Sequence, residues 1–270
     1  GNAQFYRGEF ARAEQSFLLA DRLLASPEVR EVALGCGQEL AVEVPAYLAW
    51  IYAIAGKDRE AAERRREAEQ CAPALLVGRS FGFLFSTALG ILLRDHETAE
   101  SFAAQRIRAE QLFDLAEQLR HPVFHAVAEV ALGRLQAHGG AVEEGLAAMR
   151  RGYELYEETG AQLCLAEYAG FVAEAHVEAG QADRARDLLR RVEIPGAHEY
   201  ARFYRPELAR IEAEILIAEG KADEVRSALD RGLTHSSSLD GPLPPLFAER
   251  RRAVLTRVGP EPELLFKRHA

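Results

Sequence analysis

Three glycines stand forty residues apart in this chain, and each lies between two runs of residues with helical apolar spacing. They are Gly140, Gly180 and Gly220, followed by Ala-Val-Glu-Glu, Gln-Ala-Asp-Arg and Lys-Ala-Asp-Glu. Related turns lie elsewhere in the chain, at Gly8, Gly56, 95–97 and Gly259. A fixed internal period of this size is typical of stacked helical repeats. It predicts an all-α chain, built as a solenoid of antiparallel helix pairs.

The residues around Gly180 show how one unit is built. Apolar residues recur at three- and four-residue steps over 165–176 and again over 182–192, so each run predicts a helix with an apolar stripe. A glycine between them can take positive φ and end the first helix, and the residues after it can start the second. Small residues stand where two paired helices must approach closely: Ala173 with Ala185, Ala213 with Val225, and Gly133 with Gly145.

Composition narrows the function classes. The chain has 270 residues, 48% of them hydrophobic, which is enough for a substantial core. Its formal net charge of −9 argues against general nucleic-acid binding, because a phosphate backbone would be repelled by most of its surface. One basic cluster lies near the C-terminal end, and we expect it to be a solvated helix face. It comprises Arg250, Arg251, Arg252, Arg257, Lys267 and Arg268.

The spacing of the cysteines and the length of the apolar runs indicate the cellular compartment in which the protein is expected. Cys36, Cys71 and Cys164 are widely spaced without a CxxC pair, which predicts neither a disulfide framework nor a zinc knuckle and fits a reducing cytosol. No apolar run approaches the ~20 residues that span a bilayer, and no signal peptide opens the chain. We therefore expect a cytoplasmic protein. Since the chain opens Gly-Asn-Ala, we also expect a piece of something longer, or a trimmed chain.

The helix pairs resemble the tetratricopeptide repeat (TPR). That repeat places a small residue seven positions before the turn glycine, then Ala, an aromatic residue or Leu, and Ala after it. The first unit matches with Gly8, Phe10, Ala13, Phe17 and Ala20, and the second with Leu48, Ala49, Tyr52, Gly56, Ala61, Ala68 and Pro73. Units four to six keep Gly133, Gly140, Gly145, Ala173, Gly180, Ala185, Ala213, Gly220 and Val225. Between residues 95 and 121 the helical register is open by one or two residues.

Units of forty residues exceed the usual ~34 of a TPR. That length, together with the stretches 158–161 and 206–214, is similar to the MalT-like TPR region of large bacterial signal-transduction ATPases, transcriptional regulators and cyclase-linked regulators. The resemblance implies one right-handed superhelical domain over residues 1–270. It would hold about six to seven helix pairs with a partial first repeat, and a flexible linker near 234–245.

Sequence signals for chemistry are weak. Gly139 and Gly140 precede Ala-Val-Glu-Glu, so no phosphate-binding loop is present, and the His96-Glu97 stretch carries Glu at its second metal position. His121, His125 and Glu129 share one helix face and would suit a metal site or a hydrolase. We favour the alternative of a capping His121 and a His125 bonded to Glu129. The sequence predicts no enzyme, no cofactor and no metal.

The TPR resemblance implies that the first helix of each pair lines a concave groove. The residues it places there are Glu43, Ala46, Trp50, Val127, Val130, Arg134, His138, Glu167, Glu174, Glu178, Glu207, Arg210 and Glu214. Arg134 and Arg210 could grip a carboxylate or a peptide backbone, but pairing with glutamates on neighbouring helices is the interpretation we favour. Trp50 suits either a binding anchor or ordinary core packing.

The function implied by this resemblance is that of a non-catalytic scaffold or sensor. It would bind a protein, a peptide or a small effector in its groove and act on an attached nucleotide-binding or DNA-binding domain. Direct contact with nucleic acid or membrane is not expected. The alternative is a structural self-assembly module without a groove ligand, which would form homo-oligomers.

Overall fold

The computed structural model describes residues 1–35, 40–71, 99–192, 202–235 and 245–258, and within these ranges every element is helical. The helices are α1 (Asn2–Tyr6), α2 (Phe10–Leu23), α3 (Pro27–Gly35), α4 (Leu40–Ile54), α5 (Asp58–Cys71), α7 (Ala99–Gln118), α8 (Pro122–His138), α9 (Val142–Glu158), α10 (Leu165–Glu178), α11 (Ala182–Val192), α12 (Arg205–Ala218), α13 (Ala222–His235) and α14 (Pro245–Val258). The prediction of an all-α chain is confirmed. None of these helices is long and apolar enough to cross a membrane.

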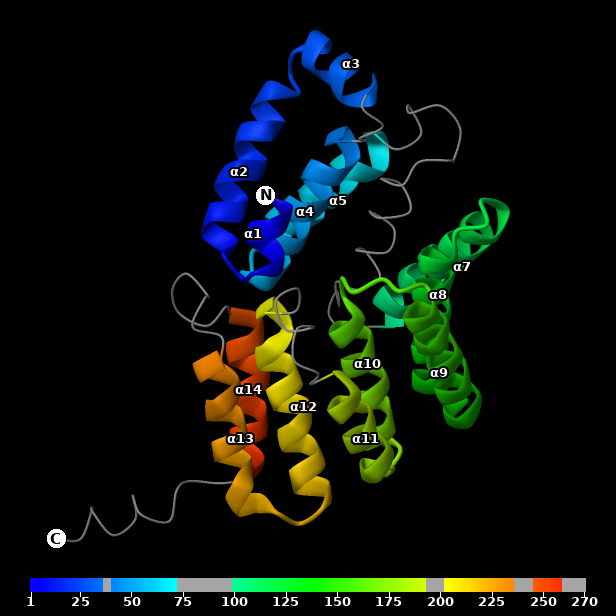
Figure 1. Ribbon diagram of the computed structural model, residues 1–270, viewed down its shortest axis with the longest axis vertical. Helices are drawn as coiled ribbons and strands as arrows, with labels where there is room; N and C mark the ends of the chain where they lie inside the picture. Colours follow the sequence, from blue (N-terminus) through cyan, green and yellow to red (C-terminus); the bar gives the residue numbers. More distant parts are fainter. Residues whose placement is uncertain (36–39, 72–98, 193–201, 236–244, 259–270) are drawn as a thin grey trace, which may run out of the picture.

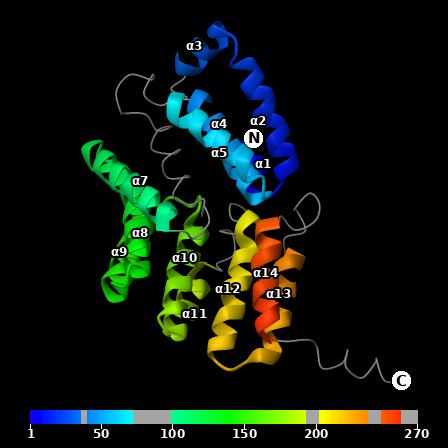
Figure 2. The ribbon, with the colours of Figure 1, turned by 180° about the vertical axis from the view of Figure 1, so that it is seen from behind.

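Consecutive helices pack as antiparallel pairs, as the repeat predicted (Figure 1). The pairs are α4 with α5, α8 with α9, α10 with α11, and α12 with α13. Helix α7 lies along α8, and α14 lies along α12 and α13, which Figure 2 shows from behind. The helices therefore stack in the order of the sequence through most of the described chain.

The turn glycines adopt the predicted conformation. Gly180 has φ +73°, and the other four turn glycines of the described pairs, Gly8, Gly56, Gly140 and Gly220, are also in the left-handed region. At this turn the Gly180 amide donates to the Val177 carbonyl at 2.9 Å, and the Gln181 amide donates to His176 at 2.8 Å. These two bonds form a Schellman motif, which satisfies carbonyls that the helix end would otherwise leave unpaired.

Small residues bring α8 and α9 into backbone contact. A Cβ atom on Gly145 would lie 2.5 Å from the Gly133 carbonyl oxygen and 2.6 Å from the Ala137 nitrogen. About two turns further along α9, a Cβ on Gly152 would lie 2.8 Å from the Ala126 carbonyl oxygen. Because these neighbours are backbone atoms, they cannot swing aside. The predicted approach of Gly133 to Gly145 is confirmed.

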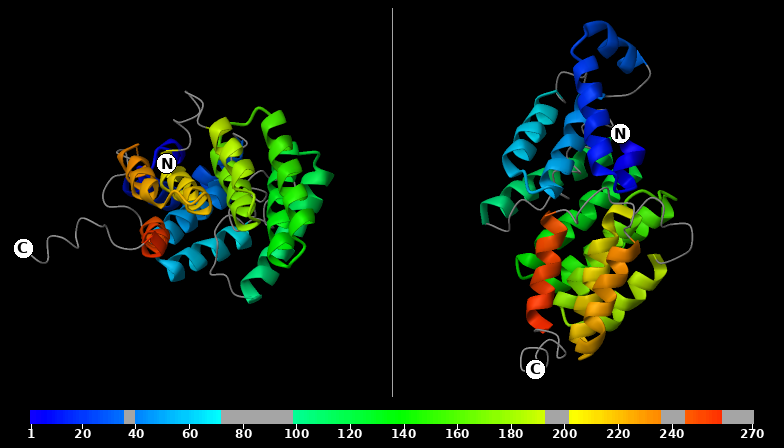
Figure 3. Two further views of the ribbon diagram at one scale, coloured as in Figure 1. Left: turned by 90° about the horizontal axis from the view of Figure 1, so that it is seen from below. Right: turned by 90° about the vertical axis from the view of Figure 1, so that its left-hand side faces the viewer.

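The main core joins helices that are far apart in the sequence. It runs from Phe5 in α1 to Phe247 in α14, and a smaller cluster lies between α12, α13 and α14. Helix α4 contacts α14, and the Phe5 ring lies 5.2 Å from that of Phe203, just before α12 (Figure 3). In an open solenoid each unit touches only its neighbours, so this contact between early and late helices is an additional feature.

Several sequence predictions fall on parts of the chain outside the described residues. They are the turn at 95–97, the turn at Gly259 and most of the proposed linker at 234–245. In the stretch with the open register, the described helix is α7, of 20 residues.

The backbone contact between α8 and α9 predicts a large penalty for one added methyl group. Gly145→Ala should destabilise the fold by about 1–3 kcal/mol, because the two helices must move apart. Urea unfolding followed by circular dichroism measures this loss. Glu144→Ala places the same side chain at the preceding, exposed position and should change stability by less than about 0.5 kcal/mol. Equal losses in the two variants would contradict the close approach.

Candidate functional site

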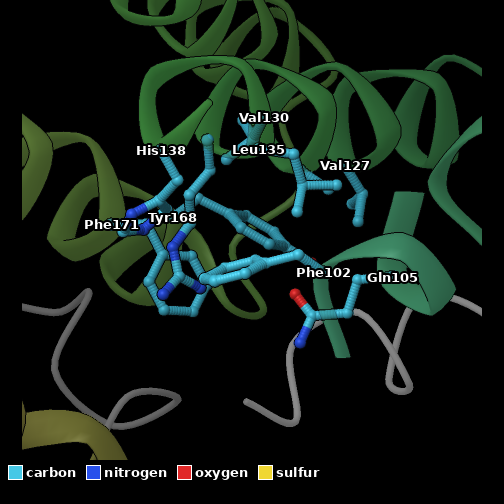
Figure 4. Close-up of a pocket in the computed structure, with 10 residues that line it drawn as sticks. Phe102, Gln105, Val127, Val130, Leu135, His138, Tyr168 and Phe171 are labelled. Atoms are coloured by element: carbon cyan, nitrogen blue, oxygen red, sulfur yellow. The ribbon is translucent and has the colours of Figure 1, made fainter. Parts of the chain in front are cut away.

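A groove lies between α7, α8 and α10, and its walls are mainly apolar and aromatic (Figure 4). It is lined by Phe102 and Gln105 of α7, by Val127, Val130, Ala131, Arg134, Leu135 and His138 of α8, and by Tyr168 and Phe171 of α10. The space open to the centre of a water molecule is about 20 Å³, room for roughly one water. A ligand group can therefore lie against the aromatic walls of the groove but cannot be enclosed by them.

Four residues of the expected concave face line this groove, namely Val127, Val130, Arg134 and His138. They lie together because steps of three and four residues place side chains on one face of a helix. Helix α8 holds this face rigidly, since its adjoining side, which includes the backbone of Val130, is in close contact with α9. The sequence therefore identified one wall of the groove.

The polar groups of the groove are cationic or neutral. The Arg134 guanidinium lies over the Phe171 ring, with its central carbon 5.5 Å from the ring centroid. The His138 ring lies 5.3 Å from that of Phe102, and Gln105 is the third polar side chain. No Asp or Glu is among the described residues that line the groove. Although the whole chain has a net charge of −9, the polar groups lining the groove are positive or neutral, which favours an anionic or neutral ligand group.

The other two walls were missed. Phe102 and Gln105 lie in α7, within the stretch whose register the sequence left open. Tyr168 and Phe171 belong to the predicted α10, where Tyr168 was assigned to the core stripe. Aromatic residues three apart on one helix were the available signal, but only the packing of α10 against α8 shows which cavity they border.

Arg210 forms intramolecular ion pairs, which confirms the favoured interpretation. Its guanidinium lies 2.6 Å from Glu174 of α10 and 2.8 Å from Glu207 of α12. Glu214 lies 3.7 Å away and also pairs with Arg257 of α14. Burial disfavours the Arg210 charge, but the neighbouring carboxylates outweigh it, so the guanidinium pKa is raised. Arg210, Glu174 and Glu214 thus join α10, α12 and α14.

Glu207 is the centre of this network. Only 1% of its surface is exposed, and its carboxylate receives both Arg210 and, at 3.1 Å, Arg250 of α14. A carboxylate buried to this extent needs such partners, because an uncompensated buried charge is strongly destabilising. Two residues of the basic cluster expected to be solvated, the partly buried Arg250 and the exposed Arg257, therefore pair with glutamates of this network.

Trp50 lies in the core and does not line the groove. It is 3% exposed, with its ring 4.5 Å from Phe5 and 5.5 Å from Phe203. Of the two interpretations open from the sequence, core packing is the one the structure shows. Glu43 and Ala46 share α4 with it, and Ala46 is also buried.

Glu167 is buried as well, with 3% of its surface exposed. Its carboxyl interacts with the Cys164 thiol, and its Oε2 atom has no hydrogen-bond partner in the described part of the protein. Burial raises the pKa of Glu167 to about 8, and the nearby Glu207 acts in the same direction. A second carboxyl of the expected concave face is therefore an interior group.

The three residues considered for a metal site have other contacts. Glu129 pairs with Arg151 at 2.8 Å, and the His125 ring packs edge-on against Phe113 at 4.5 Å. His121 is the residue at the start of α8, as expected for a position before Pro122, but its side chain makes no capping hydrogen bond. Glu129 bonds Arg151 where a bond to His125 was expected. Among the described residues, no group of three or more His, Cys, Asp or Glu is arranged to hold a metal ion.

The buried network predicts that Arg210 is needed for stability. Arg210→Met should cost about 3–5 kcal/mol, because it removes the cation that Glu174 shares with the buried Glu207 and leaves Glu207 with Arg250. Urea unfolding followed by circular dichroism measures this loss.

The matched control for this prediction is Arg186→Met. Arg186 pairs with Glu219 through two bonds of 2.7 Å, but both side chains are more exposed than those of Arg210 and Glu207, at 24% and 17%. Its loss should cost at most about 1 kcal/mol. A similar cost for Arg186→Met and Arg210→Met would show that burial of the network contributes little.

The chain has no match among models of known protein families, among curated proteins or among solved structures. The likeness to tetratricopeptide proteins therefore rests on the residues quoted for it, and the structure supports the part of it that concerns paired antiparallel helices.

Proposed function

We propose that this chain is a non-catalytic TPR-like module that binds a segment of another protein in the groove between α7, α8 and α10. The observation that carries the proposal is the aromatic and cationic lining of this groove in an otherwise acidic chain. The preferred segment presents an apolar or aromatic side chain next to an acidic one. This proposal includes the right-handed solenoid and a role in a bacterial signalling or transcriptional regulator of the MalT-like kind.

The dimensions of the groove favour a protein segment over a free small effector. With about 20 Å³ of enclosed space it cannot surround a whole metabolite, whereas a side chain of a protein segment can lie against its aromatic walls. Phe102, Tyr168 and Phe171 offer aromatic surface for that side chain. Residues outside the groove would then contact the rest of the segment.

Arg134 supplies the specificity in this proposal. Its guanidinium lies at the groove wall, with its central carbon 5.5 Å from the centroid of the Phe171 ring. A forked, charge-assisted bond from a guanidinium to a carboxylate is stronger than one to a neutral amide. An acidic residue beside the anchor should therefore bind better than its amide analogue.

Two fluorescein-labelled peptides that differ only in Asp against Asn beside a Phe test this prediction. In fluorescence anisotropy, the Asp peptide should bind about tenfold more tightly than the Asn peptide. Arg134→Met should remove the difference, whereas Arg150→Met, on the exposed face of α9, should retain it. Equal binding of the two peptides by the unaltered protein would refute the proposed role of Arg134.

A second candidate function, self-assembly, is favoured by one observation. Helices α2 and α3 expose Leu19 (52%), Leu23 (53%) and Val32 (67%), an unusual concentration of apolar side chains at one end of the molecule. Repeat arrays with apolar ends associate unless a polar cap covers them.

Sedimentation velocity over a range of protein concentrations tests this second candidate. Association should increase with concentration, and Leu19→Gln combined with Leu23→Gln should suppress it. The matched control is Ile107→Gln, which replaces an exposed apolar residue of α7. A monomer at every concentration would exclude the self-assembly module.

A further inference from the structure

The early and late helices are joined by five aromatic side chains, which we call the aromatic clasp: Phe5, Tyr6, Tyr47, Trp50 and Phe203. The first four come from α1 and α4, and the last stands just before α12. All five are at most 5% exposed, so the clasp is a buried contact between segments about 150 residues apart in the sequence. Figures 1 and 3 show the early helices lying across one end of the later pairs.

Two tyrosines of the clasp are hydrogen-bonded to further ionisable groups. The Tyr6 hydroxyl is 3.2 Å from that of Tyr47, and it also hydrogen-bonds the Cys164 thiol at the start of α10. That thiol in turn contacts the carboxyl of Glu167. A continuous chain of hydrogen bonds thus runs from α4 through α1 to α10. Its last member is a carboxyl whose Oε2 atom is without a partner in the described structure.

Other charged and titratable groups face Glu167 from the helices around it. From α12, Glu207 repels a charge on Glu167, and the neighbouring cations Arg210 and Arg250 are both bonded to Glu207. From α9 and α10, Tyr156 and Tyr168 supply phenol groups. Their pKa values are raised by burial, as are those of Tyr6 and Tyr47, so these phenols stay neutral while a carboxyl titrates.

A neutral Glu167 suits this site and an ionised one does not. A proton on the carboxyl keeps the buried contact free of a second negative charge beside Glu207. Loss of that proton would place a second carboxylate in the interior beside Glu207. The nearby cations, Arg210 and Arg250, are already paired with Glu207. The clasp can relieve this strain by opening, because each helix pair is held by its own turn and its own interface.

We propose that the aromatic clasp is a proton-controlled closure, in which α1 and α4 stay on α10 and α12 while Glu167 is protonated and separate from them when it ionises. The sign follows from linkage: the closed state holds the proton more tightly than the open state, where the carboxyl is solvated. Closure is therefore complete below pH ~4.5, the ordinary range of a glutamate, and is lost as the pH rises through about 8. This device is independent of what the groove binds.

The tryptophan of the clasp reports its state, since the chain has one Trp only. Emission from Trp50 should shift to longer wavelength as the pH rises from about 4.5 to about 8, the pKa values of the open and closed states, because water then reaches the indole ring. Far-UV circular dichroism should stay constant over the same range, because the helix pairs remain folded. Glu167→Gln, a neutral side chain of the same shape, should keep the short-wavelength emission at every pH.

Thiol labelling provides a second measurement. In a Cys36→Ser, Cys71→Ser background, Cys164 is the remaining thiol, and it is 7% exposed under the closed clasp. Its reaction with an aromatic disulfide reagent at pH 9 should be at least tenfold faster than in the same background carrying Glu167→Gln. Comparing the two at one pH removes the effect of thiol ionisation in water.

The control variant is Glu144→Gln, an exposed carboxyl on α9, which should retain the pH-dependent emission shift. Three results would overturn the proposal: constant Trp50 emission in the unaltered protein, an equal shift in Glu167→Gln, or a shift accompanied by loss of helicity. The last would show alkaline unfolding in place of clasp opening. None of these results bears on the peptide preference of the groove.

Discussion

The close approach of antiparallel helices is the constraint on which the rest of this structure depends. No helix here is stable by itself, so each must bury its apolar stripe against a neighbour. Glycines with positive φ reverse the chain in few residues, and small side chains let the paired axes come together. Where α8 and α9 touch through their backbones, α8 is fixed well enough to present Arg134 and His138 on one wall of the groove.

Polar groups inside the protein sort into two kinds. Around Glu207, charges are matched by ion pairs, and the network holds α10, α12 and α14 in one arrangement. Around Glu167, a carboxyl is matched only in part, and its neutral form suits the site best. The ion pairs fix the positions of the helices, whereas the partly matched carboxyl makes the structure sensitive to pH. Each kind includes a carboxyl of α10, Glu174 in the first and Glu167 in the second, and α10 also supplies one wall of the groove.

The sequence predicted features that depend on residues near one another in a repeat. The turn at Gly180, the contact of Gly133 with Gly145 and the pairing of Arg210 with Glu174 were all accessible in this way, because local spacing decides them. Half of the groove was also accessible, since its α8 residues follow helical spacing.

Features that depend on the relative placement of distant helix pairs could not be predicted. The position of Trp50 against Phe203 brings together residues far apart in the sequence, and local spacing does not determine such a contact. The burial of Glu167 is a consequence of the same closure. The wall formed by Phe102 was missed for a local reason, namely the open register of its helix.

The backbone contact between α8 and α9 also has a mechanical consequence. Two helices whose backbones touch at Gly133, Gly145 and Gly152 resist sliding and rocking, so they act as one stiff beam at one side of the molecule (Figure 1). Bending of the molecule must then be concentrated on either side of this beam, at the junctions with α7 and α10. These junctions are the two other walls of the groove, so any bending stress would change its width.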